Sequence, residues 1–106
     1  MSNALVTVPK TARRGEVIEI RTLVSHNMET GYRRTERGVP VPRDIIRSFT
    51  CTYNGVEVFS ADVRPAISAN PYFAFFTVAT ESGTLAFHWQ GDNGFSVSTS
   101  AQITVT

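Results

Sequence analysis

The side chains of this sequence that could bind a metal or carry sulfur are one cysteine, Cys51, two histidines, His26 and His88, and the methionine Met28. Blue-copper proteins hold their copper ion with two histidines, one cysteine and a weak axial methionine. In that class the cysteine, one histidine and the methionine usually lie close together on one loop, whereas both histidines are far from Cys51 in this sequence. The spacing therefore does not predict a copper site.

Cys51 could instead act alone as a reactive thiol, which requires an exposed position and a lowered thiol pKa. Its neighbours argue against exposure. Phe49 and Tyr53 share the face of Cys51 if the segment is a strand, because alternate side chains of a strand point to the same side. We therefore expect a buried, small apolar side chain. A small redox or thiol-carrier protein that uses Cys51 directly remains the alternative.

Neither histidine has the partners that catalysis requires. His26 stands beside Met28 and Glu29 at the expected end of a strand, and His88 falls on a polar face. No cysteine or serine nucleophile stands at a recognisable spacing from them, and glycine-rich phosphate loops, zinc-ligand clusters and nucleophile elbows are absent from the sequence. We predict no catalytic residue, no cofactor, no metal site and no enzyme activity.

The composition narrows the remaining classes of protein. A length of 106 residues with 42% apolar content fits one domain over residues 1–106. The net charge of +1 is far from what sequence-independent nucleic-acid binding needs. No stretch approaches the roughly 18 apolar residues of a transmembrane helix. We expect neither nucleic acid nor membrane as a partner, and no export signal, because charged residues interrupt the segment after Arg13 and Arg14.

The elements that must position these residues are strands. Apolar and polar side chains alternate over residues 85–90 and 95–105, and Gly91-Asp92-Asn93-Gly94 supplies a turn between them, which predicts a hairpin. Asn54-Gly55 predicts a second hairpin. Its strands are expected at residues 48–53 and 56–61, and further strands at 4–8, 17–25 and 72–78. The pattern predicts an all-β, immunoglobulin-like antiparallel sandwich of about seven strands, with a small barrel as the alternative.

Two segments differ from this simple pattern. Residues 26–42 have no strand pattern, and loops of that length in a small domain are more often functional than short connections are. The segment Tyr72–Val78 is apolar on both faces, with Phe73 and Phe75 on one side and Tyr72 and Phe76 on the other. One of the faces needs a cover. We predict that a partner subunit covers the face of Phe73 and Phe75, with the 26–42 loop as the alternative cover.

Several short motifs together resemble the SoxZ family over nearly the whole chain. They are His26-Asn27-Met28-Glu29-Thr30-Gly31, Arg33-Arg34, Val39-Pro40, Ile45-Ile46, Asn54-Gly55 and Ser68-Ala69-Asn70-Pro71, in that order and spacing. The first motif usually reads His-Pro-Met-Glu-Thr-Gly in the family. Asn27 therefore departs from the pattern, and the chain lacks the fixed backbone angle of a proline there.

The resemblance implies a non-catalytic subunit that pairs as a heterodimer with a SoxY-like carrier, whose C-terminal Gly-Gly-Cys-Gly-Gly arm holds sulfur intermediates during periplasmic thiosulfate oxidation. We expect no such arm on this chain, because the sequence ends Gln102-Ile103-Thr104-Val105-Thr106. The resemblance also implies export together with a signal-bearing partner and transient docking to the cytochrome, hydrolase and dehydrogenase components of the Sox pathway. The predicted partner interface consists of His26, Met28, Glu29, Tyr72, Phe73 and Phe75.

Overall fold

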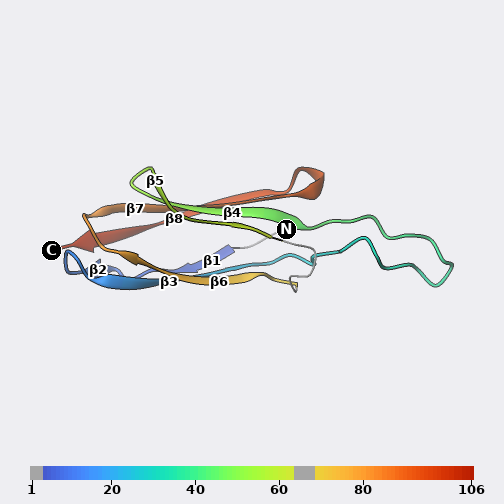
Figure 1. Ribbon diagram of the computed structural model, residues 1–106, viewed down its shortest axis with the longest axis horizontal. Helices are drawn as coiled ribbons and strands as arrows, with labels where there is room; N and C mark the ends of the chain where they lie inside the picture. The colour runs from blue at the N-terminus through green and yellow to red at the C-terminus, as the bar shows by residue number, and fades with distance from the viewer. Residues whose placement is uncertain (1–3, 64–68) are drawn as a thin grey trace.

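A computed structural model describes residues 4–63 and 69–106 and contains two β-sheets packed face to face (Figure 1). The elements in chain order are β1 (Ala4–Thr7), β2 (Thr11–Ala12), β3 (Val17–Val24), β4 (Ile46–Tyr53), β5 (Val56–Asp62), β6 (Tyr72–Val78), β7 (Gly83–Gly91), the 3₁₀ turn η1 (Asp92–Gly94) and β8 (Ser96–Val105). The predicted immunoglobulin-like sandwich is confirmed, with eight strands rather than about seven. Ser68, which begins one of the quoted motifs, lies outside the described residues.

One sheet has the strand order β1-β3-β6 and the other the order β2-β8-β7-β4-β5. Both predicted hairpins are present in the second sheet: η1 connects β7 to β8, and Asn54-Gly55 connects β4 to β5. Asn54 and Gly55 have φ angles of 48° and 84°. Two consecutive residues with positive φ form the tight turn whose twist matches that of the flanking strands, which explains the preference for Asn-Gly at this point.

The extra strand, β2, arises because the N-terminal segment changes sheets. β1 pairs antiparallel with β3, whereas β2 pairs in parallel with β8 in the other sheet. The backbone N–H of Thr104 donates to the carbonyl of Lys10 at 2.9 Å, next to this pairing. A strand of two residues is too short to show an alternation of polar and apolar side chains, so the sequence pattern does not reveal it.

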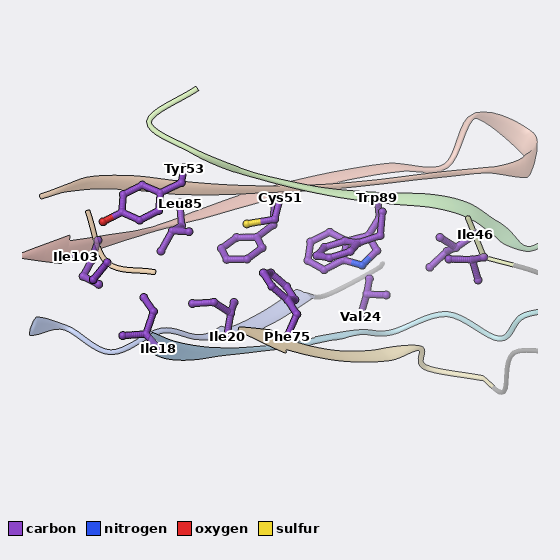
Figure 2. Packing of buried hydrophobic residues seen from close by; sticks show 14 of the residues in the cluster. Ile18, Ile20, Val24, Ile46, Cys51, Tyr53, Phe75, Leu85, Trp89 and Ile103 are labelled. Carbon is purple, nitrogen blue, oxygen red and sulfur yellow. The ribbon is translucent and has the colours of Figure 1, made fainter. Parts of the chain in front are cut away.

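The core lies between the two sheets and is rich in aromatic rings (Figure 2). Phe49 and Trp89 are fully buried on the inner face of the larger sheet, with their ring centroids 5.0 Å apart. Phe73, from the smaller sheet, stacks on Phe49 at 5.1 Å with an angle of 3° between the rings. Each buried ring contributes roughly 1.5–3 kcal/mol through removal of apolar surface from water. These contacts join the two sheets without a disulfide.

The long segment without a strand pattern is a loop that projects beyond one end of the sandwich (Figure 1). Residues 27–44, here called the projecting loop, leave the end of β3 and return to the start of β4. Its two limbs touch through isolated bridges between Glu29 and Asp44 and between Arg34 and Pro40. The molecule measures 60 × 20 × 19 Å. Among the described residues, no helix has the length and apolar character needed to cross a membrane.

Candidate partner interface

The exposed side of the three-stranded sheet carries an apolar surface, here called the outer face. Its large apolar side chains are Leu5, Val17, Leu23, Tyr72, Phe76 and Val78, with exposed fractions between 37% for Leu23 and 67% for Leu5. Strand register places them side by side across the sheet: Leu5 opposite Leu23, Leu23 opposite Tyr72, and Val17 opposite Val78. Phe76, 66% exposed, lies one step along β6 from Val78 on the same face.

The structure corrects the side of β6 that was expected to be open. Phe75 is buried, at 6% exposed, and its ring stacks on Phe59 with centroids 4.3 Å apart. Phe73 is half-buried and stacks on Phe49. Figure 2 shows Phe75 pointing between the sheets. The stacking with rings of β4 and β5 decides the orientation, so Phe73 and Phe75 belong to the core and Tyr72 and Phe76 form the open side.

The projecting loop does not cover the outer face, because Tyr72 and Phe76 remain 57% and 66% exposed. Two charged residues on this face, Arg21 and Glu19, form an ion pair with each other: the guanidinium lies 2.7 Å from the carboxylate. This hydrogen bond to Glu19 raises the pKa of Arg21, so the guanidinium stays charged at neutral pH. The outer face is therefore apolar with one internally neutralised ion pair.

Two predicted interface residues, His26 and Met28, are buried at the root of the projecting loop. The His26 ring accepts, at Nδ1, a hydrogen bond from the backbone N–H of Met28 at 2.9 Å. The backbone N–H of His26 donates to the Asn70 side chain at 2.9 Å, and the backbone N–H of Asn70 donates to the His26 carbonyl at 2.7 Å. The Met28 sulfur accepts from the N–H of Ile46 at 3.3 Å. These side chains are packed inside the root of the loop and hold it in place.

Glu29, the third residue of that predicted group, is half-buried where the two limbs of the loop meet. Its backbone N–H and carbonyl exchange hydrogen bonds with those of Asp44, at 2.8 and 2.7 Å. The Glu29 carboxylate lies 2.6 Å from the Arg33 guanidinium, and this hydrogen bond lowers the pKa of Glu29. Glu29 therefore carries a constant negative charge at neutral pH, already neutralised by its neighbour in the loop.

The sequence pattern does not reveal the structural role of Asp92, because Gly91-Asp92-Asn93-Gly94 indicates only a turn. The Asp92 carboxylate accepts two hydrogen bonds from the Arg43 guanidinium, at 2.8 and 2.9 Å, and one from the backbone N–H of Ile45 at 3.2 Å. Arg47 lies 3.4 Å away. The hydrogen bond from Arg43 is the main cause of a lowered Asp92 pKa. Asp92 thus fastens the returning limb of the loop to the turn between β7 and β8.

Cys51 is fully buried on the inner face of β4, between Phe49 and Tyr53, as predicted (Figure 2). Burial raises the pKa of its thiol to about 12. A thiol with this pKa is almost entirely protonated at neutral pH and is a poor nucleophile and metal ligand.

The structure places the two histidines in different settings. His26 lies at the loop root, and His88 is half-buried on β7, with its Nδ1 2.6 Å from the Ser98 hydroxyl of β8. In residues 4–63 and 69–106, no three histidine, cysteine, aspartate or glutamate side chains come together in a way that could hold a metal ion.

Comparisons with known proteins place the fold and the family. A superoxide reductase (neelaredoxin) from Ignicoccus hospitalis is similar with a TM-score of 0.76 and 16% identity, covering 97% of this chain and 80% of that one. The sulfur carrier protein SoxY from Chlorobium limicola f thiosulfatophilum is similar with a TM-score of 0.67 and 15% identity, covering 97% of this chain and 78% of that one. At such identities these similarities show a shared fold.

A search of curated proteins found no match. The sequence itself matches the family described as sulphur oxidation protein SoxZ over residues 6–102, which is nearly the whole chain. The motifs that resemble this family therefore belong to a match that extends through both sheets of the sandwich. The chain is a member of the SoxZ family.

Proposed function

We propose that this protein is the non-catalytic partner subunit of a SoxYZ-type sulfur carrier heterodimer in thiosulfate oxidation. It stabilises and presents a SoxY-like subunit, which carries the sulfur intermediates on its own C-terminal cysteine. The observation that carries this proposal is the family match over residues 6–102. The similarity of the fold to a SoxY structure is consistent with a heterodimer built from two related sandwiches.

The state of Cys51 supports a role without chemistry on this chain. Covalent sulfur transfer needs a thiolate that substrates can reach. With a pKa of about 12, the Cys51 thiol is ionised in only about one molecule in 10⁵ at pH 7, and its side chain has no exposed surface. Cys51 therefore meets neither condition for the alternative function, a thiol carrier that uses this cysteine directly. These properties of Cys51 support the proposal that the sulfur intermediates reside on the partner.

Intact mass spectrometry of the reconstituted heterodimer tests this proposal. The complex is incubated with thiosulfate and the enzymes of the pathway, and the masses of both subunits are measured. We expect sulfur adducts on the SoxY-like subunit and an unchanged mass for this chain. A complex containing Cys51→Ala serves as the matched control and is expected to turn over thiosulfate at the same rate. An adduct on this chain that disappears in the variant would contradict the proposal.

We also propose that the protein works in the periplasm, where it arrives in a folded state together with a signal-bearing partner, and that the heterodimer docks transiently with the other Sox enzymes. The family match supports the proposal of co-export. Cell fractionation with and without the partner gene tests it. We expect the chain to be periplasmic only when the partner is present, and periplasmic material in cells without the partner would argue against co-export.

A further inference from the structure

The outer face has the size and composition of the apolar centre of a protein interface. Its six large apolar side chains leave on the order of 500 Å² of apolar surface uncovered, at the upper end of what soluble monomers expose. A standard interface buries about 800 Å² on each partner, somewhat more than half of it apolar. The exposed apolar area therefore matches one side of a stable heterodimer.

The arrangement of these side chains also fits a flat, rigid docking surface. Leu5, Leu23 and Tyr72 form a row across all three strands at one end of the sheet, and Val17 and Val78 form a second row at the other end, next to Phe76. Each of them stands on a strand whose opposite face packs in the core, so binding requires little ordering of the backbone.

The charges on the face indicate the chemistry of the occupant. Glu19 and Arg21 neutralise each other at 2.7 Å, so the face offers no net charge to a nucleic acid or an anionic lipid surface. An apolar protein surface is the occupant that such a face favours. A partner with the same sandwich fold carries a sheet of similar twist, and two such sheets pack face to face about 10 Å apart.

We infer that the outer face is the surface on which the SoxY-like subunit docks, sheet against sheet, with Tyr72 and Phe76 as its main anchors. This inference rests on the proposed function, because it takes the SoxY-like subunit as the partner. Large aromatic side chains at the centre of an interface are the residues whose removal weakens binding most.

The test compares apolar residues of equal exposure on the two sheets. Phe76 on β6 and Val56 on β5 are each 66% exposed, and Val56 belongs to the sheet that does not carry the outer face. Affinity for the purified SoxY-like subunit is measured by calorimetry for the wild type, for Tyr72→Asp with Phe76→Asp, and for Val56→Asp. We expect the double variant to bind at least about 100-fold more weakly and Val56→Asp to bind like the wild type.

Circular dichroism checks that each variant keeps its sheets, and the milder pair Tyr72→Ala with Phe76→Ala is measured alongside, with an expected loss of about tenfold. Wild-type affinity in both double variants would overturn the inference while leaving the proposed function intact. Failure of the wild type to bind any SoxY-like subunit would refute the proposed function itself. Self-association of the isolated chain that Phe76→Asp abolishes, with heterodimer affinity unchanged, would assign the face to a second copy and overturn the inference.

Discussion

The substitution Cys51→Ala tests whether the Cys51 thiol is buried away from solvent in the folded protein. At pH 7 the thiol is protonated in both the folded and the unfolded chain, so the variant loses only the packing of one buried sulfur atom. We expect a cost of about 1 kcal/mol in the free energy of unfolding, a typical value for a small change in a core.

The difference between the two proteins should then reverse at alkaline pH. The thiol ionises near pH 9.0 in the unfolded chain and near pH 12 in the folded protein. Between these values the folded state holds one proton more than the unfolded state, so stability falls as the pH rises. The wild type should lose about 2 kcal/mol by pH 10.5 relative to pH 7, and the alanine variant is spared this loss. The two stabilities should cross between about pH 9 and pH 10.

Urea denaturation followed by far-ultraviolet circular dichroism, at intervals from pH 7 to 10.5, gives the two stability curves. All other ionisable groups are common to both proteins, so their contributions cancel in the difference. A difference that stays constant over the whole range would show that the folded protein lets the thiol ionise normally. In that case Cys51 would be accessible to solvent or stabilised as a thiolate, and direct sulfur chemistry at this site would again be a candidate.

Three further predictions, with four substitutions among them, test the rest of the structure. Phe75→Ala should lower the free energy of unfolding, measured by urea denaturation, by about 3–4 kcal/mol, because Phe75 is buried. Phe76→Ala, at the exposed neighbouring position, should lower it by less than about 0.5 kcal/mol. Equal losses in the two variants would contradict the orientation of β6. Gly91→Ala should lower the melting temperature, with a cost of about 1–3 kcal/mol, because the added Cβ would lie 2.5 Å from the Ile45 carbonyl oxygen; an unchanged melting temperature would show that this contact relaxes freely. Asp92→Asn should increase the rate of tryptic cleavage after Arg43 several-fold, since the bidentate ion pair is lost, and unchanged digestion would mean that other contacts hold the loop root.

The sequence predicts the strands best where one face is apolar and the other polar. In β8 the side chains alternate over the whole strand, and the apolar ones turn inward as expected. The position of Cys51 follows from the same rule, because Phe49 and Tyr53 fix the phase of β4. In each case the difference in burial energy between the two faces leaves one orientation favoured.

Alternation does not orient β6, because its two faces offer similar apolar area. The choice depends on which rings find partners across the core, and those partners, Phe49 and Phe59, stand on strands far away in the sequence. The positions of His26 and Met28 depend likewise on groups brought close by tertiary structure, namely the Asn70 side chain and the backbone N–H of Ile46. Local sequence carries no signal for such contacts, which is why the expected interface residues include several that prove to be buried.

Trp89 is the only tryptophan of the chain, so its fluorescence reports on the state of the core. The indole is fully buried beside Phe49, and its N–H donates to no acceptor among the residues that the structure describes. Indole in such an apolar setting emits at short wavelength, and exposure to water shifts the emission to the red. Trp89 belongs to the five-stranded sheet, which does not carry the outer face. Docking of a partner on the outer face should therefore leave the emission wavelength of Trp89 unchanged. A single emission spectrum can therefore separate a variant that has lost its partner from one that has lost its fold.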